Sequence, residues 1–317
     1  MRVKKDFFKN SWSLIIASFN AFNEDSALKM SAALAYYTTF SLAPLLIMLI
    51  SLASFIYGGD AIQGKVFEGI NQFVGNEAAL QIQGIIEKVT TRENSTWAII
   101  TGFVTLFLGA TGVFVEIQGS INMIWRVRAK PKKGWVKLIT NRLLSFSMIA
   151  TLGFLLIVSL IINGIVMVLS DHLKIYFPDI TILLVDGFNI VLTFIIISAL
   201  FGTIFKFLPD VEISWKDVRI GTFFTALLFM LGRFLIGFYI EKTAPGSVYG
   251  TAGSIIIILV WIYYTSAILY FGAEFTQVYA ETYGGKIKPS SYAVHIIQKE
   301  EERNVKVLPP QNHEDQL

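Results

Sequence analysis

Long uncharged runs of apolar residues divide this chain. Thirty residues without a charge separate Lys29 from Asp60, and comparable runs recur along the rest of the sequence. About 20 apolar residues cross a hydrocarbon layer as a helix, the structure that satisfies every backbone group internally. The runs are apolar on both faces, whereas the strands of a membrane barrel alternate. We therefore predict an all-α, polytopic membrane protein with six transmembrane helices, over residues 32–57, 97–124, 141–170, 181–205, 217–240 and 252–280.

The basic residues are distributed unevenly between the segments that connect these helices. Of the 26 basic residues, 20 fall on one side of the membrane, five fall on the other, and Arg233 lies within a predicted helix. Because basic residues concentrate on the cytoplasmic side, we predict that both termini are cytoplasmic. The loop after the second helix is the most basic, and its side chains either set this topology or contact anionic lipid headgroups. Those residues are Arg126, Arg128, Lys130, Lys132 and Lys133.

Three segments outside the predicted helices have patterns of their own. In residues 1–30, aromatic and apolar side chains recur every three or four positions, which predicts an amphipathic helix at the cytoplasmic membrane interface. The alternative is that this helix packs against the transmembrane domain, residues 31–285. The external segment 58–96 shows the same spacing and predicts two short amphipathic helices. Residues 286–317 are polar and charged, so we predict a disordered cytoplasmic tail.

Ionisable side chains inside the predicted helices are functional candidates, because charges are costly in hydrocarbon. The helical rise places Asp186 and Arg233 within about 4 Å of the same depth, in the outer half. We predict an ion pair between them, which serves transport or is an ordinary contact between helices. Glu116 and Glu274 share the inner half with Asn122. They either line a cavity open to the cytoplasm, or Glu274 reaches the interface and ends its helix.

Small residues cluster where the sixth predicted helix begins. Gly246, Gly250 and Gly253 stand at intervals of three or four residues there. Such glycines let helix backbones approach closely in membranes, so we favour tight helix packing over a substrate-binding loop. Gly232 and Gly237, on the fifth helix, are candidates for the facing surface.

The chain has few of the residues and motifs that enzymes commonly use for catalysis. It has no cysteine, and its three histidines, His172, His295 and His313, lie outside the predicted helices. Phosphodiester hydrolysis needs clustered carboxylates with metal ions, or histidine as general acid and base. A phosphate-binding loop with the spacing of ATP-driven pumps is also missing. We therefore expect no catalytic residues, no metal, no cofactor and no nucleic-acid partner.

Three stretches together form a recognisable pattern. They are residues 31–44 (SAALAYYTTFSLAP), residues 116–125 (EIQGSINMIW), and residues 246–253 taken with 272–275 (GAEF). In this combination, over roughly residues 10–285, the chain resembles the YihY/virulence factor BrkB family of bacterial inner-membrane proteins. The resemblance implies a six-helix inner-membrane fold. Members have carried a ribonuclease label, and serum resistance and envelope lipid transport have been associated with the family, but no catalytic residue set comes with it.

Buried polar groups, a basic inner loop and amphipathic segments occur together in this chain. We interpret it as an inner-membrane protein that handles or transports lipid or another amphiphile in the cell envelope, with membrane lipids as its partners. One alternative is a non-transporting scaffold that holds an envelope protein. The other is a transporter of small solutes or ions.

Overall fold

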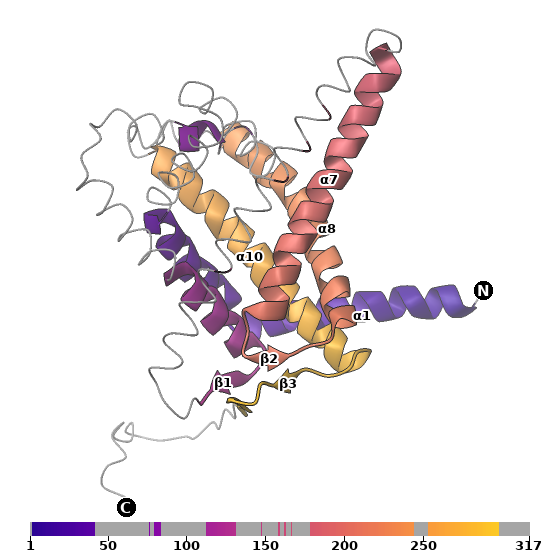
Figure 1. The fold of residues 1–317 in the computed structure, drawn as a ribbon, viewed down its shortest axis with the longest axis vertical. Helices are drawn as coiled ribbons and strands as arrows, with labels where there is room; N and C mark the ends of the chain where they lie inside the picture. Colours follow the sequence, from indigo (N-terminus) through magenta and orange to yellow (C-terminus); the bar gives the residue numbers. More distant parts are fainter. Residues whose placement is uncertain are drawn as a thin grey trace, which may run out of the picture.

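Three long helices dominate the structure. The computed structural model describes residues 2–41, 76, 79–83, 112–130, 147, 158, 162, 166, 178–243 and 253–297. The long helices are α7 (Pro178–Phe207), α8 (Trp215–Thr243) and α10 (Gly253–Thr282). A fourth helix, α1 (Arg2–Glu24), runs across one end of this group (Figure 1).

Each long helix contains a stretch that is long and apolar enough to cross a membrane. The stretches are Gly187–Phe207, Trp215–Lys242 and Ile255–Thr282. They confirm that the last three predicted transmembrane segments are long apolar helices.

The first three predicted segments and the external segment are described only in part. Residues 27–41 and 112–124 are helical, in agreement with the first two predicted helices where they overlap. Most of 141–170 lies outside the described residues. Within 58–96 only residues 76 and 79–83 are described, and they are helical. The six-helix count and the orientation therefore stay predictions.

The outer surfaces of α7 and α8 are apolar where a water-soluble protein would be polar. Phe234 is 75% exposed, and Leu184 is 61% exposed. Many further large apolar side chains on these two helices are exposed, among them Phe188, Ile190, Val191, Ile195, Phe223, Leu231, Leu235 and Phe238. Exposing this many large apolar side chains to water is costly. Contact with lipid chains removes that cost, so these surfaces fit a membrane-embedded protein.

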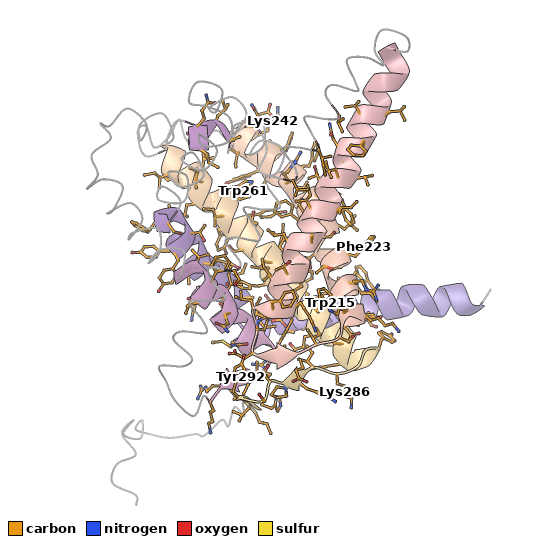
Figure 2. The ribbon with its side chains drawn as sticks, viewed as in Figure 1. Trp215, Phe223, Lys242, Trp261, Lys286 and Tyr292 are labelled. Atoms are coloured by element: carbon orange, nitrogen blue, oxygen red, sulfur yellow. The ribbon has the colours of Figure 1, made fainter. Side chains whose placement is uncertain are left out.

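Aromatic and basic side chains mark both ends of α8. Trp215, at its start, meets the Phe207 ring edge-on at 5.8 Å and lies 5.5 Å from the Lys206 ammonium. At the other end the Lys242 ammonium lies 5.7 Å from the centre of the Phe238 ring. Figure 2 shows Trp215 and Lys242 at opposite ends of the helix. Tryptophan and lysine are typical of the two membrane–water interfaces, so α8 has anchors suited to both.

Glycines face threonines where α8 crosses α10. A Cβ added at Gly221 would lie 2.8 Å from Thr276 Cβ, and one added at Gly272 would lie 2.8 Å from Thr225 Cβ. Each threonine hydroxyl donates to the carbonyl of the glycine four residues before it in its own helix. The two helices therefore run antiparallel with reciprocal glycine–threonine contacts, which bring the backbones unusually close.

The glycines predicted to pack around the start of α10 have different surroundings in the structure. A Cβ at Gly232 would lie 2.9 Å from the Tyr264 ring, so this glycine does face α10. At Gly237 no described residue lies within 4 Å of the added Cβ, so its predicted contact is not found in the described part of the chain. Gly253 is buried at the start of α10. Gly246 and Gly250 lie outside the described residues.

The end of the bundle where α7 finishes and α8 begins carries four short strands, and we call it the strand end (Figure 1). Strand β1 (Val127–Ala129) pairs antiparallel with β4 (Ala293–His295). Strand β2 (Val211–Glu212) pairs antiparallel with β3 (Lys288–Pro289).

These pairings correct the predicted disorder of the tail, because residues 286–297 are ordered against two loops. Two- and three-residue strands are too short to produce a recognisable alternation, so the polar composition was misleading here. Residues 298–317 lie outside the described residues.

Helix α1 packs one side of its C-terminal half against α10. Leu14 and Phe22 are buried, and the Phe22 ring meets Phe271 edge-on at 5.7 Å. Trp12 and Phe19, on the other side, are exposed. Figure 1 shows the N-terminal half of α1 projecting beyond the long helices. The packing alternative is therefore correct for half of the helix, while the exposed aromatic side suits a membrane interface.

Candidate functional site

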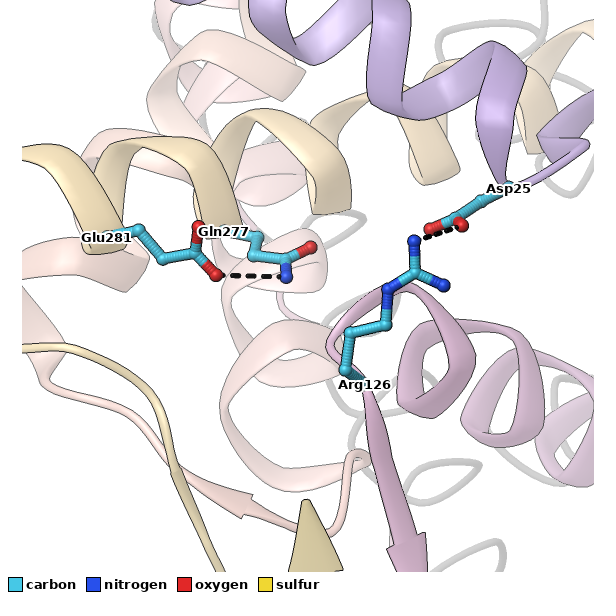
Figure 3. A network of polar contacts seen from close by, with 4 residues as sticks. All are labelled: Asp25, Arg126, Gln277 and Glu281. Atoms are coloured by element: carbon cyan, nitrogen blue, oxygen red, sulfur yellow. Dashed lines mark hydrogen bonds and ion pairs between the residues drawn. The ribbon is translucent and has the colours of Figure 1, made fainter. Parts of the chain in front are cut away.

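Three charged side chains from three separate elements meet at the strand end. Asp25 follows α1, Arg126 follows helix 112–124, and Glu274 lies in α10. Arg126 Nη2 and Asp25 Oδ1 form an ion pair of 2.6 Å (Figure 3). Glu274 is 0% exposed and lies close enough to Asp25 to influence its pKa. We call these three residues the triad.

The backbone fixes two members of the triad. Ser26, directly after Asp25, has a φ of 53°, and Arg126 has a φ of 55°. This left-handed conformation ends helices, so each residue marks a sharp change of chain direction. The Arg126 N–H donates to the Met123 carbonyl, and the Arg126 carbonyl accepts a 2.7 Å bond from the Ile296 N–H. The hydrogen bonds between β1 and β4 thus extend by one residue, to the backbone of Arg126.

Burial and charge act in opposite directions on Asp25. Burial raises the pKa of the Asp25 carboxyl above its ordinary value. The Arg126 charge and its hydrogen bond, followed by the nearby Glu274 carboxyl, lower this pKa, but burial is the larger effect. Asp25 is therefore easier to protonate than an exposed aspartate, despite its ion pair.

Glu274 is the least satisfied polar side chain at this end of the bundle. Neither of its carboxyl oxygens has a well-formed hydrogen bond with any residue that the structure describes. A buried carboxylate without partners costs several kcal/mol, roughly. The alternative that Glu274 reaches the interface and ends its helix is wrong, because it is fully buried and α10 continues to Thr282.

The structure gives Glu116, Asn122 and Glu274 different surroundings among the described residues. Glu116 is half-buried and accepts a 3.5 Å bond from the Ser120 hydroxyl. Gln277 donates to Glu281 on the exposed side of α10 (Figure 3). Asn122 is bound elsewhere, and Glu274 has no exposure to water. The described contacts link Glu274 to the triad, and the predicted cavity between the two glutamates stays a prediction.

Asn122 belongs to a second polar cluster, centred on Asp210. The buried Asp210 carboxylate accepts bonds from Asn122 Nδ2 at 2.8 Å and from Gln118 Nε2 at 3.2 Å. In return the Asp210 N–H donates to Asn122 Oδ1 at 2.8 Å. The Asp210 carbonyl accepts from the Ser290 N–H at 3.1 Å. These bonds tie helix 112–124 to the loop after α7 and to the C-terminal segment.

Tyr292 adds the C-terminal segment to the Asp210 cluster. Burial raises the pKa of the Tyr292 phenol, and the charge of Asp210 and its hydrogen bond raise it further. Figure 2 places Tyr292 and Lys286 at the strand end. Because the bonds of this cluster are well formed, we interpret it as a structural connection between these three segments.

Asp217 takes part in the hydrogen-bonded cap at the start of α8. It accepts from the Ser214 hydroxyl at 2.8 Å, while its own N–H donates to that oxygen at 3.2 Å. The Gly285 N–H also donates to Asp217, at 3.1 Å. The spacing Ser-x-x-Asp before an apolar run is a helix-capping signature. The sequence therefore contained a signal for Asp217 that its position in a polar loop obscured.

Arg233 is half-buried on α8, within an otherwise uncharged run of the span. Among the described side chains no acidic group forms an ion pair with it. The side chain of Asp186 lies outside the described residues, so the predicted pair between Asp186 and Arg233 stays a prediction. Arg233 is flanked by exposed apolar side chains, including Phe234 at 75% and Leu235 at 58%.

The basic loop after helix 112–124 has divided roles. Arg126 is engaged in the triad, while Arg128 and Lys130 are exposed at the strand end. Lys132 and Lys133 lie outside the described residues. No group of three or more histidine, aspartate or glutamate side chains that could hold a metal ion occurs in the part of the chain that the structure describes.

Comparison with known proteins finds one matching family and several related membrane proteins. The profile of the family described as virulence factor BrkB matches residues 18–295. A UPF0761 membrane protein of Verminephrobacter eiseniae is 28% identical over 220 residues, which is 68% of this chain and 49% of that protein. Another, from Alcanivorax borkumensis, is 27% identical over 284 residues, which is 85% of this chain and 61% of that protein.

A third relative, a UPF0761 membrane protein of Pseudomonas paraeruginosa, is 28% identical over 262 residues, 80% of this chain and 59% of that protein. The chain thus spans about half to three-fifths of the length of these relatives. No solved structure matches it. Because the family profile covers most of the chain and the relatives are membrane proteins, the chain is an integral membrane protein that belongs to the virulence factor BrkB family.

Proposed function

We propose that this protein binds an anionic amphiphile, such as a phospholipid, against its membrane-spanning helices and moves it across the bacterial inner membrane. The observation that supports this proposal most is Arg233. By the rise of 1.5 Å per residue, it lies about 7 Å from the middle of its span. A charge at this depth is costly, and such residues usually line a path or face a ligand.

The surroundings of Arg233 suit a molecule with a charged head and apolar chains. The guanidinium donates paired hydrogen bonds to phosphate, with a geometry that few other side chains provide. The exposed side chains of Leu231, Phe234 and Leu235 surround it with apolar surface. A phosphate bound to Arg233 would neutralise its charge, while acyl chains lie along that surface. The proposed role is therefore non-enzymatic binding and transport, in a protein with six membrane-spanning helices and cytoplasmic termini.

Lipid retention tests this function. Wild-type protein, extracted gently, is examined by native mass spectrometry beside Arg233→Gln and beside Arg219→Gln. Arg219 is a matched control, because it is exposed on the same helix and donates to the Trp215 carbonyl. Charge-assisted hydrogen bonds contribute about 1.5–3 kcal/mol, so Arg233→Gln should weaken retention of phosphatidylglycerol by about ten- to hundredfold.

The control variant should retain the same lipid as the wild type, in the same ratio of lipid to protein. Equal retention by wild type and Arg233→Gln would contradict the proposal. Retention of a stable protein partner without any lipid selectivity would instead support the scaffold alternative.

A further inference from the structure

The triad contains more acid than base, and both of its carboxyl groups are buried. The side chain of Asp25 is 5% exposed and Glu274 is 0% exposed, whereas the Arg126 side chain is 28% exposed. The titratable groups that act on Asp25 are Arg126 and the neighbouring Glu24 by their charge, and Glu274 by its side chain. From the other side of α10, α8 presents no titratable side chain between Arg219 and Arg233. One guanidinium therefore faces two buried carboxyl groups.

The charge balance of the triad depends on one proton. If both carboxyl groups were ionised, one negative charge would stay uncompensated in a buried site, at a cost of several kcal/mol, roughly. Arg126 is already committed to Asp25 by the 2.6 Å ion pair. The Glu274 oxygens have no well-formed hydrogen bond to relieve the cost of a charge among the described residues. Two neighbouring carboxyl groups that cannot both ionise commonly share a proton.

We propose that Asp25 and Glu274 share one proton beside Arg126, and that this proton-binding site controls the docking of α1 against α10. The ligand is the proton itself, which is exchanged with water on the Arg126 side, where the triad is partly exposed. Binding forms one O–H bond on the carboxyl pair and leaves the triad neutral. Release leaves two carboxylates opposite one guanidinium, at the contact between the end of α1 and α10. This site would exist whether or not the protein transports an amphiphile.

Infrared spectroscopy of the full-length protein in detergent or lipid counts the protons directly. A protonated carboxyl gives a C=O stretching band that a carboxylate lacks. At neutral pH the wild type should show this band, and Glu274→Gln should lose one proton equivalent of it. Asp25→Asn should lose the same amount, because Glu274 then faces Arg126 alone and ionises. Arg126→Gln should increase the band, because both carboxyl groups lose their cation.

Glu281→Gln is the matched control for the band. Glu281 lies two helical turns from Glu274 in α10, is exposed, and accepts a hydrogen bond from Gln277 (Figure 3). Its replacement should leave the band unchanged. A wild type without the band, or a band that survives both Glu274→Gln and Asp25→Asn, would overturn the proposal. If one of these two variants does not fold, the other makes the same distinction.

Hydrogen exchange tests the coupling to α1. In the wild type, the protection factors of amides over Leu14–Phe22 should fall by about tenfold or more when the pH is raised until the band disappears. In Glu274→Gln, which keeps the shape of the protonated side chain, protection should stay constant over the same pH range. The same fall in both proteins would show that the proton does not control the docking.

Discussion

Replacing Arg126 by glutamine is expected to destabilise the protein by about 3 kcal/mol at neutral pH. The loss of one partner from a buried ion pair costs about 3–5 kcal/mol, and the partial exposure of Arg126 places it at the lower end. Glutamine is chosen because it leaves the strain of the left-handed backbone at this position roughly unchanged, whereas glycine would relieve that strain. Arg128→Gln is the control, because Arg128 is exposed two residues later in β1.

The effect of Arg126→Gln should depend on pH with a defined sign. Burial already raises the pKa of Asp25 above its ordinary value of 3.8. A carboxyl with a raised pKa holds its proton longer in the folded than in the unfolded state. Its contribution to stability is therefore complete below pH 3.8 and is lost as the pH rises through the folded-state pKa.

Arg126 lowers the pKa of Asp25, so removing Arg126 raises this pKa further. In the variant, the stability contributed by Asp25 is therefore lost over a range that extends to higher pH. Thermal unfolding in detergent should show a large difference from wild type at neutral pH and a small one in mild acid. A difference that is independent of pH, or as large in Arg128→Gln, would mean that Arg126 acts through packing alone.

Gly221→Ala should separate α8 from α10 and lower the melting temperature. Its Cβ would lie 2.8 Å from Thr276 Cβ and 2.9 Å from Thr276 Cγ2, so the helices must move apart. Overpacking of this kind costs about 1–3 kcal/mol, which exceeds the gain of up to about 1 kcal/mol from replacing a helical glycine by alanine. Gly237→Ala is the control on the same helix, because no described residue lies within 4 Å of the added Cβ, and it should be neutral or stabilising.

A compensating change distinguishes this contact from a general effect on α8. Adding Thr276→Gly removes the atoms that the new methyl group meets, so the double variant should recover part of the loss caused by Gly221→Ala. This interaction is measured by a double-mutant cycle of melting temperatures. Strict additivity of the two changes would contradict the reciprocal contact.

The sequence was sufficient for features that repeat along one helix. Uncharged runs predicted α7, α8 and α10, because hydrocarbon excludes charges over a whole span. The spacing of aromatic residues predicted helix α1. Gly232 is also correctly assigned to a helix contact, whereas no described residue meets Gly237, since periodicity alone does not decide which side of a helix packs against its neighbour.

The candidate site depends on contacts that no local pattern contains. Asp25 and Glu274 are 249 positions apart, and each has an unremarkable neighbourhood in the sequence. Arg126 was assigned to topology or to lipid headgroups, because basic residues after a transmembrane helix usually serve there. Asp210 lies in a short polar loop of the sequence, and only the fold brings it to Asn122. Long-range pairing of this kind is decided by how helices pack, and the sequence of each helix leaves it open.

Transbilayer movement of a labelled phospholipid in reconstituted vesicles tests the proposed transport of amphiphiles most directly. Vesicles with the wild-type protein should move labelled phosphatidylglycerol between leaflets about tenfold faster or more than protein-free vesicles. Arg233→Gln should fall toward the protein-free rate, because loss of one charge-assisted contact corresponds to at least about a tenfold change in binding. Arg219→Gln should match the wild type. A wild-type rate equal to that of protein-free vesicles, or an undiminished rate in Arg233→Gln, would contradict the account.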